Sequence, residues 1–279
     1  MIHSDWHIHS CYSYDAQTSL EEIVSGARAQ GLKYVGITDH ANRNDDKFLS
    51  DLYASAENVK KMQKDAPELV LGVEFTPIPK PHFDYMAKTR TYEGFTPPIQ
   101  STPYDIELAV TKDELIELGV RYAICASHAR VDSLDTDKTK LTECINEWFR
   151  QQMWMAQDER TTILGHPWYI GNGLWYEDFS VIPYSMQDEL LSALKQNGKI
   201  MECNFCMLQG RNQTEKFRHQ YAEFLRDAFE RGIRITYGSD CHGKQEGKYP
   251  DMRPQLYPYL EGAGFVDGDF YTLTENDLW

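Results

Sequence analysis

The sequence has few cysteines and no long apolar run. Six cysteines in 279 residues are too few for a disulfide scaffold. No stretch approaches the roughly 20 consecutive apolar residues of a membrane helix. The first residues also lack the basic and apolar segments of a signal peptide. We therefore expect a cytoplasmic protein that does not enter a membrane.

Basic residues are also scarce. The chain has 28 Lys and Arg against 43 Asp and Glu, which gives a net charge of −15. No Lys/Arg cluster forms the basic face that is typical of a nucleic-acid-binding protein. The G-x-x-x-x-G-K-[ST], G-x-G-x-x-G and G-x-S-x-G motifs are absent, which argues against nucleotide motors, dinucleotide oxidoreductases and serine hydrolases. We expect a small-molecule partner, and neither nucleic acid nor an anionic membrane surface.

Short apolar runs of strand length alternate with helical patterns along the chain. This alternation predicts an α/β fold with a parallel sheet. Seven such strands favour a distorted (β/α)7 TIM-like barrel, and an open doubly wound sheet is the alternative. The predicted strands are residues 4–8, 34–38, 69–73, 121–127, 161–165, 199–204 and 234–238. The predicted helices are residues 18–30, 51–64, 138–158, 184–196 and 213–230, and residues 257–279 are expected to add a helix and an extended stretch.

One segment interrupts this rhythm. Residues 76–111 contain six prolines and several aromatic residues. We interpret them as a long excursion from a single domain that spans residues 1–279. Long loops are often lids or binding loops, and a surface elaboration without a catalytic part is the alternative.

Metal-binding side chains end most of the predicted strands. In a β/α barrel the carboxyl ends of the strands form the face that carries the active site. Residues at i and i+2 of a strand point to the same side. His7 and His9 near the start of the chain can therefore bind one ion together, and Asp240 and His242 near its end have the same spacing. The residues in question are His7, His9, His40, Glu74, His128, His166, Asp240 and His242.

Imidazole nitrogen and carboxylate oxygen make up this ligand set. Such a set suits Zn, Mn or Fe better than calcium, which prefers oxygen ligands throughout. The number of donors exceeds the about three protein ligands of one catalytic zinc. The sequence therefore predicts a centre with several ions, and Glu74 is the natural bridging carboxylate between them.

Six motifs in this order resemble the polymerase-and-histidinol-phosphatase (PHP) superfamily. They are DWHIHS at 5–10, GITDH at 36–40, GVE at 72–74, SHA at 127–129, GHP at 165–167 and GSDCH at 238–242. The resemblance implies a distorted (β/α)7 barrel that holds three metal ions. It also implies a division of the ligands. One ion would take His7, His9, Glu74 and Asp240, a second Glu74, His128 and His166, and the third Asp15, His40 and His242.

The resemblance further implies hydrolysis of a small organic phosphate monoester by a hydroxide that bridges two ions. Three divalent ions against three carboxylates would make this site positive inside an acidic protein, which favours an anionic substrate. Asp240, His242 and Arg130 are the candidate catalytic side chains. Arg130, Arg43 and Trp168 are the candidate substrate contacts.

The substrate itself is less constrained. Histidinol-phosphatase relatives carry an arginine shortly after a Glu-x-Asn on the sixth strand, where this chain has Cys206. This difference argues against histidinol phosphate as the substrate. Three alternatives to a monoesterase stay open: a phosphodiesterase or nuclease of the same superfamily, an amidohydrolase-type enzyme, and a metal-binding regulatory protein without catalysis.

Overall fold

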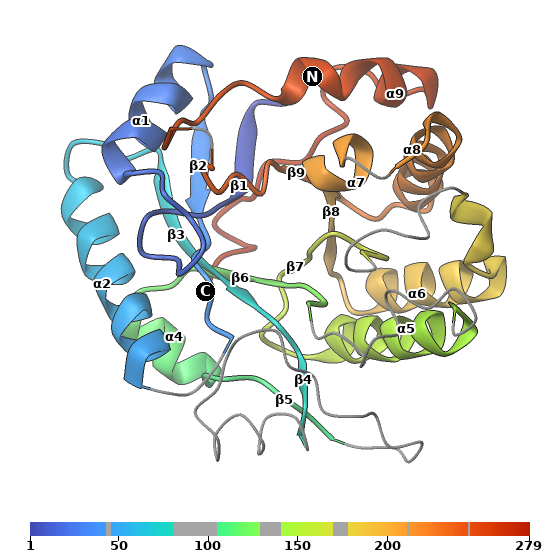
Figure 1. Ribbon diagram of the computed structural model, residues 1–279, viewed down its shortest axis with the longest axis horizontal. Helices are drawn as coiled ribbons and strands as arrows, with labels where there is room; N and C mark the ends of the chain where they lie inside the picture. Colours follow the sequence, from blue (N-terminus) through green and yellow to red (C-terminus); the bar gives the residue numbers. More distant parts are fainter. Residues whose placement is uncertain (43–45, 81–104, 129–140, 170–177, 211–212, 245) are drawn as a thin grey trace.

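The computed structural model describes residues 1–42, 46–80, 105–128, 141–169, 178–210, 213–244 and 246–279. Its centre is a ring of seven parallel strands in the spatial order β1-β2-β3-β6-β7-β8-β9 (Figure 1). The strands are β1 (Ser4–Ile8), β2 (Tyr34–Ile37), β3 (Leu69–Phe75), β6 (Tyr122–Cys125), β7 (Ile163–Leu164), β8 (Ile200–Asn204) and β9 (Ile235–Gly238).

The ring is nearly closed, because the first and last strands lie side by side. Ile8 forms a parallel bridge with Cys241, and the amide of His9 donates to the Cys241 carbonyl at 3.1 Å. The amide of Asp240 donates to the His7 carbonyl at 2.7 Å. The predicted seven-stranded α/β barrel is therefore confirmed, and the alternative of an open doubly wound sheet is wrong.

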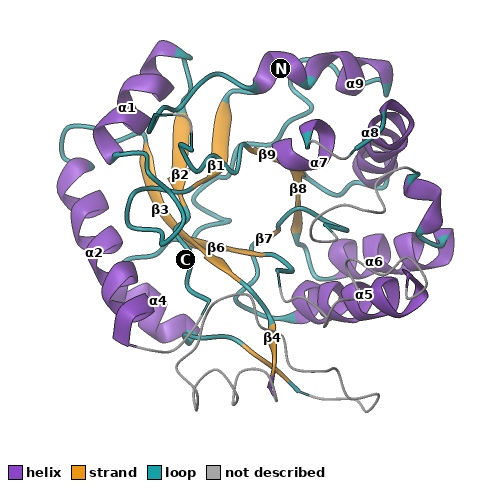
Figure 2. Ribbon diagram, viewed as in Figure 1, coloured by secondary structure: helices purple, strands orange, loops and turns teal. Residues whose placement is uncertain are grey.

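Helices surround the strands on the outside of the ring (Figure 2). Those of eight or more residues are α1 (Leu20–Ala29), α2 (Asp46–Met62), α5 (Leu141–Gln157), α6 (Tyr184–Gln196) and α8 (Glu215–Glu230). Shorter ones are α4 (Lys112–Leu118), α7 (Phe205–Gln209) and α9 (Tyr257–Gly262), with 3-10 turns at Phe179–Val181 and Arg253–Gln255. Within the described part of the chain, no helix has the length and apolar character needed to cross a bilayer.

The sequence prediction needs correction around residues 76–118. Two short strands, β4 (Ile78–Pro79) and β5 (Ile106–Glu107), form an antiparallel pair at the two ends of the excursion. Helix α4 follows and was not predicted. It is only seven residues long, but Thr111 and Glu114 make a capping box and Gly119 ends it with φ 79°. The T-x-x-E spacing is the signal that identifies such a helix. Residues 81–104 lie outside the described residues.

The structure also defines the start of helix α1 and the course of the C-terminal tail. Helix α1 begins at Leu20 because the Ser19 side chain, rather than Thr18, accepts from the amide of Glu22. The tail has the predicted helix α9, and its extended stretch adds to the barrel edge, where the amide of Tyr271 donates to the Ile235 carbonyl at 2.7 Å.

A buried tyrosine ties β6 to β1 beneath the site. The hydroxyl of Tyr122 donates to the Trp6 carbonyl at 2.6 Å, and both residues are almost fully buried. A Cβ atom at Gly36 would lie 1.8 Å from this hydroxyl, and one at Gly72 would lie 2.6 Å from the ring. Glycine at both positions therefore lets Tyr122 cross β2 and β3, which holds the strands that carry the site in register.

Candidate metal centre

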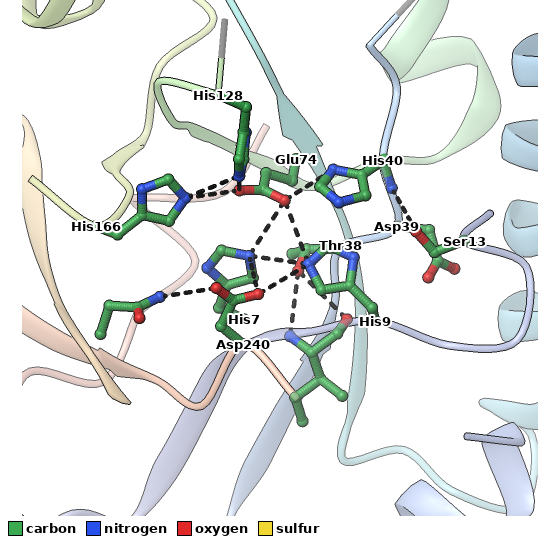
Figure 3. A network of polar contacts seen from close by, with 12 residues as sticks. His7, His9, Ser13, Thr38, Asp39, His40, Glu74, His128, His166 and Asp240 are labelled. Atoms are coloured by element: carbon green, nitrogen blue, oxygen red, sulfur yellow. Dashed lines mark hydrogen bonds and ion pairs between the residues drawn. The ribbon is translucent and has the colours of Figure 1, made fainter. Parts of the chain in front are cut away.

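All nine predicted metal ligands lie within the described residues, and they come together in space. Figure 3 shows seven of them, His7, His9, His40, Glu74, His128, His166 and Asp240, at the carboxyl ends of the strands. The nine residues form three groups, and within each group the ligand atoms lie within 4.8 Å of one another. The carboxyl ends of six strands and the loop after β1 contribute to them, so residues from position 7 to position 242 converge. The groups are His7, His9 and Asp240; Glu74, His128 and His166; and His9, Asp15, His40 and His242.

Glu74 lies between the groups and is fully buried. Its Oε1 faces His166 Nε2 at 3.3 Å and His128 Nε2 at 3.6 Å. Its Oε2 faces the other side, 3.4 Å from His7 Nε2 and 3.2 Å from His9 Nε2. The two oxygens of one carboxylate thus address two separate sets of imidazoles, which is the geometry of a bridging ligand.

His7 on β1 and His9 directly after the strand show the expected i, i+2 relation. Their Nε2 atoms lie 3.1 Å apart. Asp240 follows β9, and its Oδ1 lies 3.5 Å from His7 Nε2 and 3.3 Å from His9 Nε2. Residues from the first and last strands therefore converge on one point because the barrel closes there.

The third group is built around Asp15 in the loop after β1. Its Oδ2 lies 3.1 Å from His242 Nε2 and 3.6 Å from His40 Nε2. His9 also joins this group, since its ring centroid lies 4.1 Å from that of His242. The family-based division assigned His9 to the first ion only, whereas the structure places it between the first and third groups.

The converging nitrogen and oxygen atoms of the site are arranged to bind metal ions rather than to hydrogen-bond one another. Two pairs of imidazole Nε2 atoms, in His7–His9 and in His128–His166, face each other at 3.1 Å. The buried Oε2 of Glu74 is also surrounded by ring nitrogens, 2.9 Å from His40 Nδ1, 3.4 Å from His7 Nε2 and 3.2 Å from His9 Nε2. Facing lone pairs on buried atoms are costly without a cation between them, and a bound ion would satisfy them. Imidazole and carboxylate donors suit Zn, Mn or Fe.

Neighbouring groups fix which ring nitrogen is available. His128 Nδ1 lies 2.9 Å from the Thr76 hydroxyl, which itself donates to Asn42 Oδ1 at 2.9 Å. Thr76 can therefore only accept from His128, so the hydrogen sits on Nδ1 and Nε2 keeps its lone pair. His242 Nδ1 donates to the Asp240 carbonyl at 2.8 Å with the same result. Such contacts orient metal-binding imidazoles.

Backbone strain is concentrated at the site. His166 has φ 24°, Trp168 has φ 63° and Asp240 has φ 53°. A positive φ costs a residue with a Cβ atom about 1–3 kcal/mol, and it persists where the surroundings impose it. Two of these three residues are candidate ligands, which indicates that the fold holds them for a geometric purpose.

The charges in the site shift one another strongly. Burial opposes charge on His40, yet Glu74 and Asp15 outweigh burial and raise its pKa to about 10. Burial lowers the pKa of His128 to about 3, although Glu74 opposes that shift. Burial would raise the pKa values of Asp15 and Asp240, but the neighbouring imidazoles hold both well below the ordinary range. The carboxylates are therefore ionised at neutral pH and ready to bind cations.

Of the three predicted substrate contacts, only Trp168 lies within the described residues. Arg43 and Arg130 lie outside the described residues. Trp168 is only 1% exposed and stacks on Phe149 with ring planes 3° apart, so it lies in the core rather than on the open site. The chain brings Tyr169 to the site instead, with its ring centroid 5.0 Å from that of His166.

Sequence reasoning also missed the buried acids behind the ligands. Asp5 accepts from the amides of His7 and Ser239, and burial raises its pKa to about 6. Glu202 on β8 lies 2.7 Å from His7 Nδ1. Asp5 shares the side of β1 with His7, so strand alternation was a usable signal for it. Nothing in the spacing of residues links Glu202 to His7, 195 positions away.

Comparison with known proteins agrees with this geometry. The family model described as PHP domain matches residues 5–206. The solved structure of histidinol phosphate phosphatase from Lactococcus lactis subsp. lactis, in complex with zinc, L-histidinol and phosphate, is similar at a TM-score of 0.66 and 18% identity, covering 99% of this chain and 98% of that one.

A candidate histidinol phosphatase from Listeria monocytogenes is similar at a TM-score of 0.58 and 16% identity, covering 86% of this chain and 95% of that one. At these identities the likeness is one of fold. A search of curated proteins found no significant match.

Proposed function

Because this chain belongs to the PHP domain family, we propose that it is a metal-dependent phosphatase that hydrolyses a small organic phosphate monoester. The observation that carries the proposal is the position of Glu74, whose two oxygens face two different sets of imidazoles. We propose that three ions of Zn, Mn or Fe occupy the three ligand groups. When bound, such ions lower the pKa of a coordinated water and neutralise phosphoryl oxygens.

The exposure of the ligands supports an entry route for the substrate. The side chains of His7, His9 and Glu74 have no exposed surface. The side chain of His128 is 30% exposed and that of Asp15 is 26% exposed. A substrate would therefore approach the rim formed by these two residues, while the buried ligands hold the floor.

Asp240 and His242 serve in this proposal as ligands rather than as proton donors. His242 Nδ1 is bonded to the Asp240 carbonyl, and its Nε2 faces Asp15. Asp240 Oδ1 faces two imidazoles, and its pKa is well below the ordinary carboxyl range. Neither side chain offers a free proton, so these two residues fix the geometry around the reacting phosphoryl group. Arg130 and Arg43 remain the proposed phosphate contacts.

The substrate class follows from charge and from one difference in sequence. The site would be positive within a chain of net charge −15, so a compact phosphate ester fits it better than a long polyanion. The Lactococcus lactis relative was solved with L-histidinol and phosphate. This chain has Cys206 where histidinol phosphatases carry an arginine, so we propose a different small phosphorylated metabolite.

Phosphatase assays on the purified protein test this function. Activity on p-nitrophenyl phosphate should exceed activity on bis-p-nitrophenyl phosphate, depend on added Zn, Mn or Fe, and vanish in His128→Ala. The matched control is His219→Ala, because His219 lies on α8 against Tyr259, away from the ligand groups. Greater activity on the diester would favour the phosphodiesterase alternative, and activity without bound metal would refute the proposal.

A further inference from the structure

A buried carboxylate on β8 links two of the three ligand groups from behind. Glu202 has no exposed surface. Its Oε1 lies 2.7 Å from His7 Nδ1, and its Oε2 accepts from the backbone amide of His166 at 2.6 Å. The Asn204 side chain donates to the same Oε2 at 3.2 Å and lies 3.4 Å from Asp240 Oδ2. One side chain thus contacts ligands of the first and second groups.

The surrounding backbone leaves room for this carboxylate. A Cβ atom at Gly238 would lie 1.8 Å from Glu202 Oε1 and 2.6 Å from the His7 Cβ. Oε2 accepts a hydrogen bond from the backbone amide of His166. The φ of His166 is 24°, and a backbone held in this region needs surrounding contacts to keep it there. Gly238 on β9 and the strained His166 after β7 therefore both adjoin the Glu202 carboxylate.

We propose that Glu202 is a positioning residue that selectively builds the first and second metal sites, an inference that rests on the proposed function. The Oε2 atom of Glu202 accepts from the His166 amide and from Asn204, and with Oε1 accepting as well, His7 carries its hydrogen on Nδ1 and presents the Nε2 lone pair to the ion. The other oxygen holds the His166 backbone in the conformation that aims its ring at Glu74. Among the described contacts, Glu202 touches none of Asp15, His40 and His242.

The isosteric variant Glu202→Gln distinguishes this role from simple packing. The carboxylate faces hydrogen-bond donors on both sides, two at Oε2 and one at Oε1. A glutamine has one acceptor, so its oxygen would face the two donors and its amino group would face His7 Nδ1. Neutral His7 would then accept at Nδ1 and carry its hydrogen on Nε2, where it can no longer bind an ion.

The test measures the affinity of each ion in wild type and variant. Protein loaded with ¹¹³Cd²⁺ gives one resonance per site, and competition with a chelator gives each dissociation constant. For Glu202→Gln we expect about 10–100-fold weaker binding at two sites and unchanged binding at the third. Glu202→Asp keeps both acceptors but is shorter, so it should show a smaller loss at the same two sites.

Glu147→Gln is the matched control, because Glu147 is also buried and contacts Arg150 and Gln151 on its own helix. Circular dichroism of the metal-free variants checks the fold, and Glu202→Asp replaces Glu202→Gln if the latter does not fold. Unchanged affinities at all sites, or equal loss at all three in a folded variant, would overturn the inference. A wild type that binds no ion would refute the proposed function instead.

Discussion

The Thr76 hydroxyl lies 2.9 Å from His128 Nδ1 and donates its own hydrogen to Asn42 Oδ1. This relay leaves His128 no choice of tautomer and directs its Nε2 toward Glu74 and His166. Thr76, two positions before β4, thus serves the site, although it is not one of the nine candidate ligands.

Replacing Thr76 with valine should weaken the second metal site about tenfold, because His128 loses the acceptor that fixes its ring. Isothermal titration with zinc measures the change. Thr161→Val is the matched control, since Thr161 is also buried but precedes β7 at the opposite end of the strand from His166. Equal affinity in Thr76→Val and wild type would show that the hydroxyl has no orienting role.

Metal binding should release protons at neutral pH. In the metal-free protein the pKa of His40 is raised to about 10, so this imidazole is protonated at pH 7 and must lose its proton to bind an ion. His128, with a pKa of about 3, is already neutral. Apparent affinity should therefore rise as the pH increases from 6 toward 9. Calorimetry in two buffers of different ionisation enthalpy counts the protons, and a buffer-independent heat would contradict the assignment.

Removal of the ions should lower thermal stability. Ions that bind only the folded chain stabilise it by about 4 kcal/mol at a concentration a thousandfold above Kd, which corresponds to a Tm shift of about 10 °C. Differential scanning calorimetry before and after chelation measures the shift, and adding zinc back should restore it. A Tm that does not respond to chelation or refilling would mean that the ligand cluster does not bind ions in solution.

The close approach of Tyr122 to β2 predicts a specific coupling. Gly36→Ala places a Cβ atom 1.8 Å from the Tyr122 hydroxyl, so the variant should lose about 1–3 kcal/mol of unfolding free energy. Tyr122→Phe should lose about 1 kcal/mol, because the hydrogen bond to the Trp6 carbonyl disappears. The double variant should be less destabilised than the sum of the two, as urea unfolding will show. Strict additivity would mean that the two residues do not collide.

Much of the barrel and of the ligand set follows from local sequence patterns. Alternation on β1 puts His7 and His9 on one side, and the order of strand-ending histidines predicts where they meet. The family resemblance supplied Asp15, which lies beside His242. The barrel and the ligands at the strand ends depend on short spacings and on one rule of barrel topology, so the sequence carries them directly, whereas Asp15 was implied only by the resemblance.

Other features depend on contacts between distant segments and were missed. Glu202 meets His7 across 195 positions, and no periodicity connects them. Trp168 looked like a pocket residue because it follows His166, but its φ of 63° turns it into the core and leaves Tyr169 beside the ligands. Helix α4 was overlooked because seven residues give too short a pattern, although its capping box is visible.

The most direct test of the metal centre is an anomalous difference map from crystals grown with zinc. The geometry predicts one peak between His7, His9 and Asp240, and a second between His128 and His166, with an oxygen of Glu74 at each. A third peak should lie among Asp15, His40 and His242. A map with no peak at Glu74, or with zinc bound elsewhere, would contradict the account.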